Sequence, residues 1–298
     1  MTSVPDVRQA IVDGVVVLDG GLATLLEARG HDLSSDLWSA RLLTDDPEAI
    51  VAAHAEFYEA GAQVATTASY QASFPGFATL GLDADAAADL MRRSVALASR
   101  ARDEHRPDGW VAASVGPYGA YLADGSEYRG DYDLDVAGLR EFHRPRLDVL
   151  AGAGADILAV ETVPCLAEVE ALCAELDGTG VTAWLSLSAA GDRTRAGEPL
   201  REAWTMTADV DEIVATGVNC CDPDDVTIAL ADASGPLVAY PNSGQGWDAV
   251  RRTWTGESAF EAGAVAGWLN EGARLVGGCC RVGPTDIAAV SAVVSARA

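Results

Sequence analysis

Short apolar runs alternate along the chain with longer stretches in which apolar residues recur at helical spacing. Eight of the runs have the length and composition of buried strands. They are Val15–Leu18, Gln63–Thr67, Val111–Val115, Ile157–Val160, Thr182–Leu187, Thr216–Val218, Leu237–Tyr240 and Arg274–Val276. Between them, alanine-rich amphipathic stretches predict helices at Pro47–Ala60, Asp85–Glu104, Leu134–Ala151, Leu166–Leu176 and Glu257–Asn270. Capping or first-turn residues stand near several starts, including Asp46, Asp83 and Ser258.

This alternation predicts an α/β fold with parallel strands and right-handed crossovers. Eight such units predict a single (β/α)8 barrel of the TIM type, with residues 1–298 forming one domain. An open, doubly wound sheet is the alternative with the same order of elements. The glycine-rich stretch 151–155 precedes its strand, whereas a phosphate-binding loop follows a strand, so we interpret it as a helix-to-strand turn.

The composition narrows the classes of partner. The 298 residues carry a formal net charge of −25, and 49% of them are hydrophobic. So large an excess of negative charge argues against nucleic acid and anionic membranes as partners, and it suits a cationic small molecule. The sequence shows no charged-then-apolar leader and no apolar run of membrane-spanning length, so we expect a cytoplasmic protein.

Cysteine is placed in a way that predicts a metal site. Gly217-Val218-Asn219-Cys220 and Gly277-Gly278-Cys279-Cys280 each end a short apolar run. Three thiolates that converge from two strand ends favour zinc, and three protein ligands leave a fourth position open, as in catalytic zinc sites. The alternative is a set of buried thiols packed in the core. Cys221 follows Cys220 directly and would point to the other side, so we expect it to pack rather than to bind metal.

The other predicted strand ends are also polar. In a barrel of this type, reactive residues lie where the strands end. The first strand ends in Asp19-Gly20-Gly21, the third in the segment 114–119, and the fourth in Glu161-Thr162-Val163-Pro164-Cys165. A carboxylate at the end of an apolar strand is costly without a partner, which makes Glu161 a candidate for binding a cation. The simplest alternative for Asp19-Gly20-Gly21 is a strand-to-helix turn.

In this order, the motifs resemble the homocysteine S-methyltransferases, a zinc-dependent group that includes S-methylmethionine:homocysteine and betaine–homocysteine methyltransferases. The resemblance runs from DGG at 19–21 to GGCC at 277–280 and is carried by GVNC, TASYQAS, SVGPYG and ETVPC. It implies that Cys220, Cys279 and Cys280 bind Zn²⁺. It also implies that Glu161 holds the ammonium group of homocysteine and that Asp19 takes a related part.

Three further residues complete the expected substrate contacts. Gly20 and Gly21 allow the backbone to approach the substrate and would offer N–H groups to its carboxylate. Asn219 is expected to orient the substrate or a loop rather than to bind metal, since sulfur ligands suit zinc better.

The resemblance implies methyl transfer from a sulfonium donor, S-methylmethionine or S-adenosylmethionine, to the thiol of homocysteine, forming methionine. A free thiol has a pKa of about 8.5, and coordination to zinc would deprotonate it. The segments 118–132 and 240–244 resemble the S-methylmethionine-using branch more than the betaine branch. The first contains four tyrosines, at 118, 121, 128 and 132, whose aromatic faces suit a sulfonium cation, so we expect this loop to shape the donor site. The alternative is an ordinary covering loop.

Three other functions stay open on the sequence. Zinc would activate a selenol as well as a thiol, so the acceptor could be selenocysteine or another thiol. The chain could instead be the homocysteine-activating part of a larger methionine synthase, with a separate partner for the methyl donor. The third alternative is a non-catalytic barrel that stores or senses zinc.

Overall fold

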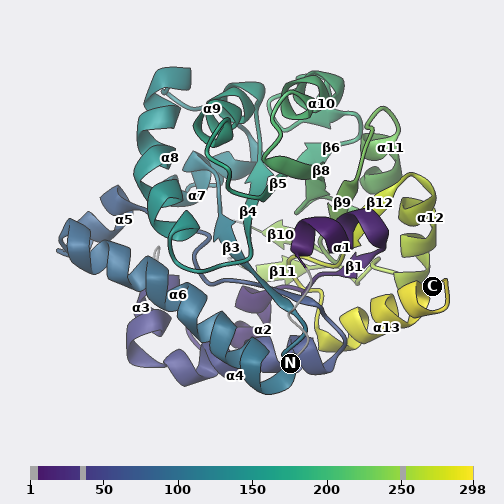
Figure 1. Ribbon diagram of the computed structural model, residues 1–298, viewed down its shortest axis with the longest axis horizontal. Helices are drawn as coiled ribbons and strands as arrows, with labels where there is room; N and C mark the ends of the chain where they lie inside the picture. The colour runs from purple at the N-terminus through teal and green to yellow at the C-terminus, as the bar shows by residue number, and fades with distance from the viewer. Residues whose placement is uncertain (1–5, 34–37, 249–252, 298) are drawn as a thin grey trace.

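Eight parallel strands form a barrel in the computed structural model, which describes residues 6–33, 38–248 and 253–297 (Figure 1). The strands lie in the order β1-β12-β9-β8-β5-β4-β3-β2. Their bounds are β1 Val16–Val17, β2 Val64–Thr66, β3 Trp110–Val115, β4 Ile157–Val163, β5 Ala183–Leu187, β8 Ile213–Asn219, β9 Leu237–Tyr240 and β12 Ala273–Val276. A parallel bridge between Leu18 and Val64 joins the two ends of this order and closes the ring. The predicted (β/α)8 barrel is therefore confirmed.

Helices surround the ring of strands (Figure 1). The longer helices are α4 Pro47–Glu59, α6 Ala84–His105, α8 Val136–Ala151, α9 Leu166–Leu176, α10 Leu200–Ala208 and α13 Pro284–Ser295. The shorter ones are α1 Val7–Asp13, α2 Leu22–Ala28, α3 Trp38–Asp45, α5 Phe74–Thr79, α7 Tyr118–Leu122, α11 Val226–Leu230 and α12 Val265–Asn270, with 3-10 turns η1 Ser126–Tyr128, η2 Pro223–Asp225 and η3 Ala262–Ala264. Among the described residues, no helix combines the length and the apolar character needed to cross a membrane.

Each strand divides its side chains between two buried clusters. On β3, Trp110 and Ala112 belong to the cluster inside the barrel, whereas Val111 and Ala113 pack between the strands and the helices. Because successive side chains of a strand point to opposite faces, Ser114 must face the inside, near the end of β3. Helix α1 adds two apolar residues to the inner cluster and lies across the middle of the ring in Figure 1.

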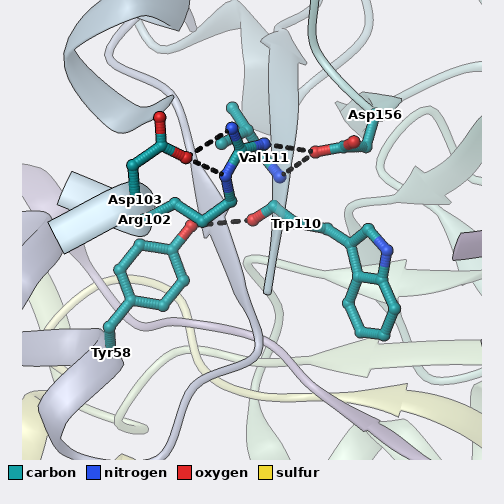
Figure 2. A network of polar contacts seen from close by, with 6 residues as sticks. All are labelled: Tyr58, Arg102, Asp103, Trp110, Val111 and Asp156. Atoms are coloured by element: carbon teal, nitrogen blue, oxygen red, sulfur yellow. Dashed lines mark hydrogen bonds and ion pairs between the residues drawn. The ribbon is translucent and has the colours of Figure 1, made fainter. Parts of the chain in front are cut away.

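A network of polar contacts ties two outer helices to the beginning of β3 and β4 (Figure 2). The hydroxyl of Tyr58, on α4, donates to the carbonyl oxygen of Trp110 at 2.7 Å. Asp156, just before β4, accepts from Arg102 of α6 at 3.2 Å and from the N–H of Val111 at 2.7 Å. These contacts lie where the strands begin, the end of such barrels at which residues serve stability.

The predicted helix at Glu257–Asn270 is shorter in the structure, where only η3 and α12 are helical. Glu261 has an extended backbone, with a φ of −119° and a ψ of 118°, so the helix cannot begin before it. The preceding residues are held against another loop, since the N–H groups of Ala259 and Phe260 both donate to the carbonyl of Ser243, at 2.7 and 3.0 Å. The hydroxyl of Ser258 donates to the same carbonyl at 3.3 Å and therefore caps no helix. Two short hairpins that the sequence did not indicate, β6 Ala189–Ala190 with β7 Arg193–Thr194 and β10 Gly246–Asp248 with β11 Thr253–Thr255, follow strand ends.

Candidate active site

Three cysteine sulfurs converge where β8 and β12 end. The Sγ atom of Cys280 lies 3.9 Å from that of Cys220 and 4.0 Å from that of Cys279. All three sulfurs lie within 4.8 Å of one another. Zinc–sulfur bonds of about 2.3 Å in a tetrahedral arrangement place sulfurs roughly 3.8 Å apart. The spacing of the sulfurs and their soft donor character therefore fit a single thiophilic metal ion.

The backbone around this triad is held by the loop after β9. The N–H of Cys279 donates to the carbonyl of Pro241 at 2.7 Å, and that of Cys280 to the side-chain oxygen of Asn242 at 3.0 Å. Cys220 adopts a left-handed conformation with a φ of 50°. Such a conformation costs a non-glycine residue about 1–3 kcal/mol and is found mostly at functional sites. The chain thus accepts local strain to direct Cys220 toward the other two thiols.

The three thiols do not share negative charge equally. Hydrogen bonds from Cys279, Cys280 and the hydroxyl of Tyr128 hold the pKa of Cys220 below its ordinary value. The contact with Cys220 in turn raises the pKa of Cys279 and of Cys280. A bound metal removes the remaining thiol protons, so metal binding here is linked to proton release.

The other cysteines lie apart from this site. Cys221 is fully buried in the core between strands and helices, as its place after Cys220 suggested. Burial raises the pKa of Cys165 and of Cys173 to about 12, so both are inert thiols.

A cavity of about 160 Å³ opens over the triad and is lined by residues from the ends of β1, β2, β3, β4, β8, β9 and β12. Glu161 lies on this cavity and is almost fully buried. Its carboxylate accepts from the hydroxyl of Ser114 and, at 3.1 Å, from that of Tyr240. Burial raises the pKa of Glu161 to about 7 despite these two donors. A bound cation would restore the charged form of this carboxylate.

Asp19 lies on the same cavity and is held by one residue of β2. Its two oxygens accept from the N–H and the hydroxyl of Thr66, at 2.7 and 2.8 Å. Burial raises the pKa of Asp19 to about 8, and the negative charge of Glu161 adds to the shift. Two carboxylates that influence each other's ionisation across one cavity form a site suited to a cationic group.

The two glycines after Asp19 are required by close packing. An ideal Cβ on Gly20 would lie 2.3 Å from the carbonyl oxygen of Val282, and one on Gly21 would lie 2.6 Å from that of Cys279. Both glycines line the cavity. The N–H of Gly21 donates to Val282 at 3.0 Å, so this donor is already engaged, and a role for the two glycines in binding substrate stays a prediction.

Asn219 lies behind the wall of the cavity rather than on it. Its side chain is fully buried and is hydrogen bonded to the N–H and hydroxyl of Thr162, at 2.7 and 2.8 Å, and to the hydroxyl of Ser186 at 2.8 Å. Thr162, like Cys220, has a left-handed φ, of 63°. Asn219 thus ties the end of β4 to the end of β8; its effect on substrate orientation stays a prediction.

The tyrosine-rich loop is divided between two environments. Tyr128 lines the cavity, with its hydroxyl 3.1 Å from the Sγ of Cys220. Tyr118, by contrast, packs against Tyr121, Tyr132 and Phe142, with ring centroids 5.0–5.6 Å apart. A donor-binding role for this loop stays a prediction, and Tyr128 is the tyrosine of the four that faces the site.

The sequence analysis assigned no individual role to several residues that line the cavity, among them Thr66, Ser114, Glu127 and Tyr240. Thr66 and Ser114 could have been predicted from the sequence, whereas Glu127 could not. Alternate side chains of a strand face the inside of the barrel, and Thr66 and Ser114 fall at inward-facing positions of their strands, as Glu161 does. The predicted strands therefore already indicated that these two side chains point inward. Glu127 lies on η1, within the tyrosine-rich segment 118–132 that the sequence analysis singled out, but nothing in the sequence distinguishes it from the other acidic residues there.

Comparison with known proteins gives one consistent result. A family model described as homocysteine S-methyltransferase matches residues 16–294. The homocysteine S-methyltransferase of Escherichia coli (strain K12) is 46% identical over 93% of this chain and 94% of that protein. The selenocysteine Se-methyltransferase of Brassica oleracea var. italica is 39% identical over 93% of this chain and 88% of that protein. The crystal structure of the metallated homocysteine methyltransferase MmuM from E. coli has a TM-score of 0.87 at 43% identity, covering 97% of this chain and all of that one (100%).

Proposed function

The chain belongs to the homocysteine S-methyltransferase family, and from this premise we propose that it transfers a methyl group from a sulfonium donor to the thiol of homocysteine, forming methionine. The observation that carries the proposal is the placement of three converging thiols and two buried carboxylates on one cavity. Homocysteine has a thiol that must be activated and an ammonium group that must be bound. The thiols can hold an activating metal, and the carboxylates can bind the ammonium group.

We further propose that Cys220, Cys279 and Cys280 hold Zn²⁺, because thiolates suit zinc and three protein ligands beside an open cavity leave the free fourth position that catalytic zinc sites have. When bound, the ion keeps the substrate thiol deprotonated near neutral pH and orients it. The hydroxyl of Tyr128 lies 3.1 Å from the Sγ of Cys220, on the same cavity. Its ring helps to exclude water from the reacting sulfur.

The carboxylates fix the other end of the acceptor. Glu161 takes the ammonium group of homocysteine, and the hydroxyls of Ser114 and Tyr240 hold its carboxylate in one orientation. Asp19, fixed by Thr66, adds a second negative group to the same side of the cavity. An amino acid anchored in this way has its side chain free to reach the cysteine triad.

The chemical step needs little from acid or base groups of the protein. The homocysteine thiolate attacks the methyl carbon of the donor, one carbon–sulfur bond forms, and the bond between that carbon and the donor sulfur breaks. The electron pair of the broken bond stays on the donor sulfur, which leaves as a neutral thioether. Because the leaving group is neutral, no proton has to be supplied, and alignment of the two sulfurs with the methyl carbon is the main requirement.

The test is methionine formation by zinc-loaded protein given homocysteine together with S-methylmethionine, S-adenosylmethionine or betaine in separate reactions. Turnover with a sulfonium donor is expected, and the relative kcat/KM values identify the preferred one. Turnover with betaine alone would contradict the sulfonium assignment. A protein that binds zinc but forms no methionine from any of the three donors would contradict the proposed function.

A second acceptor is supported by one comparison, since the Brassica relative acts, by its name, on selenocysteine. A metal site that activates a thiol also activates a selenol. The two acceptors are separated by measuring kcat/KM for homocysteine and for selenocysteine with the same donor. We expect homocysteine to be preferred, and the reverse order would reassign the acceptor while leaving the chemistry unchanged.

A further inference from the structure

A third carboxylate lies on the cavity and is used by neither the metal site nor the acceptor site. Glu127 belongs to η1, in the loop that follows β3, and lines the cavity together with Tyr128. Within the part of the chain that the structure describes, its Oε2 atom is buried and has no hydrogen-bond partner. A buried carboxylate oxygen without a donor is costly unless a ligand supplies the missing interaction.

The loop is built to hold this carboxylate in place. An ideal Cβ on Gly119 would lie only 2.3 Å from the backbone nitrogen of Glu127, so helix α7 and η1 touch where no other residue fits. The N–H of Gly130 closes the turn on the carbonyl of Ser126 at 2.8 Å. On the far side, the guanidinium of Arg195 lies 5.7 Å from the centre of the Tyr128 ring. Glu127 is thus fixed between two packed contacts rather than carried on a free loop.

The position of Glu127 suits the donor rather than the acceptor. Tyr128, its neighbour, has its hydroxyl 3.1 Å from the Sγ of Cys220, and the thiolate of Cys220 acts on Glu127 electrostatically. Methyl transfer requires the donor sulfur to line up with an acceptor sulfur held near those thiols. Glu127 lines the same cavity as the triad and stands next in sequence to the residue that contacts Cys220, so it is placed for the donor, whereas Glu161 and Asp19 serve the ammonium of the acceptor.

The positive charges of the two substrates also favour this position for the donor. The acceptor brings one ammonium group, which two carboxylates already face, and a sulfonium donor brings a further positive centre at the reacting sulfur. We propose that Glu127 binds the sulfonium centre of the methyl donor and thereby selects cationic donors, an inference that rests on the proposed methyl transfer. The sulfur of the donor is positively charged and that of the departing thioether is neutral. Glu127 therefore attracts the donor but not the thioether, which can leave more easily.

The test compares Glu127→Gln with Asp133→Asn in the zinc-loaded protein. The first change keeps the size of the side chain and removes its charge. The second removes a charge from an exposed residue of the same loop that does not line the cavity. For Glu127→Gln we expect kcat/KM for S-methylmethionine to fall about 10- to 100-fold, equivalent to roughly 1.4–2.7 kcal/mol. The KM for homocysteine and the thermal midpoint should stay close to those of the wild type. Asp133→Asn should leave all three values near those of the wild type.

Two inhibitors separate the sulfonium from the ammonium group of the donor. Trimethylsulfonium carries only the first, and methionine carries only the second. Both constants are measured at saturating homocysteine, which fills the acceptor site, so that each inhibitor competes with the donor. The inhibition constant of trimethylsulfonium should then rise about tenfold or more in Glu127→Gln, while that of methionine should not change.

The inference is overturned if trimethylsulfonium does not inhibit the wild type, or if the constant for methionine is the one that rises. Equal donor kinetics in Glu127→Gln and Asp133→Asn would overturn it as well, with wild-type turnover intact and the proposed function still standing. Failure of the wild type with every sulfonium donor would instead remove the proposed function, and this inference with it.

Discussion

Replacing Glu161 by glutamine removes a negative charge from the cavity while keeping the side chain's shape. In the structure the carboxylate accepts hydrogen bonds from Ser114 and Tyr240, and both donors are hydroxyls that can rotate to suit an amide. The variant should therefore fold, keep its metal and retain the wall of the cavity. What it loses is the charge that we assign to the ammonium of homocysteine.

The size of the loss follows from that single interaction. A hydrogen bond to a charged group contributes about 1.5–3 kcal/mol. Asp19 moderates the effect, because the charge of Glu161 helps to raise the pKa of Asp19 and its removal lets Asp19 ionise more readily. We therefore expect a loss of about 2 kcal/mol, which corresponds to a roughly 30-fold increase in the KM for homocysteine.

The assay is steady-state methionine formation at saturating donor with homocysteine varied, run beside zinc content and thermal unfolding. The KM for the donor should change little, because Glu161 is assigned to the acceptor. Ser114→Ala is the matched control: it removes one positioning hydroxyl but no charge, so its effect on the same KM should be smaller. A folded, zinc-loaded Glu161→Gln with an unchanged KM for homocysteine would refute the assignment.

Four further outcomes are expected. Cys280→Ala should lose zinc and activity but retain its circular dichroism spectrum, whereas Cys221→Ala should keep its zinc; full zinc content in Cys280→Ala would remove the three-thiolate assignment. The KM for homocysteine should rise as the pH falls through 8 and then 7, because Asp19 and Glu161, with pKa values near 8 and 7, take up protons and lose the charge that holds an ammonium; a wild-type pH profile in Glu161→Gln would contradict this cause. Gly217→Ala should lower the free energy of unfolding by about 3 kcal/mol in denaturant titrations, since its Cβ would lie 2.0 Å from a backbone carbonyl of β9, and an unchanged midpoint would show that the strands can part. Zinc-free protein treated with a mild oxidant should lose free thiols and can then no longer be activated by zinc alone, because Cys280 Sγ lies only 3.9–4.0 Å from the other two sulfurs; reductant plus zinc should restore both the thiols and the activity, and damage insensitive to that treatment would have another cause.

The barrel and the convergence of its three cysteines were predictable because both follow from periodic or local features. Every predicted strand appears within a few residues of its expected bounds, since short buried runs between amphipathic helices have few other arrangements. Cys220 and Cys279 then fall at strand ends, and the topology brings strand ends together whatever the details of packing. Glu161 follows from the same reasoning.

The structural features that the sequence did not predict depend on contacts between segments far apart in the chain. The helix expected from Glu257 begins only at Ala262, because Glu261 is extended and the residues before it are held against the carbonyl of Ser243, on a distant loop. Asn219 precedes a metal ligand, yet parity turns it inward and Thr162 engages its amide, a partner 57 positions away. The composition of the chain and the spacing of its motifs do not show which distant residue will form a hydrogen bond with a given side chain. Structural roles of this kind, such as that of Asn219, can be assigned only from the three-dimensional structure.

The loop after β3 shows why this matters for function. Glu127 is one of 45 acidic residues, and what sets it apart is its position over the cavity, which the close contact at Gly119 imposes. The cysteine triad and the proposed acceptor site, by contrast, are built at the ends of strands that the barrel cannot move without losing its core. Loops tolerate change far better than strands do. We therefore expect the choice of methyl donor to vary with the loop in this architecture, while the barrel keeps the proposed thiol chemistry fixed.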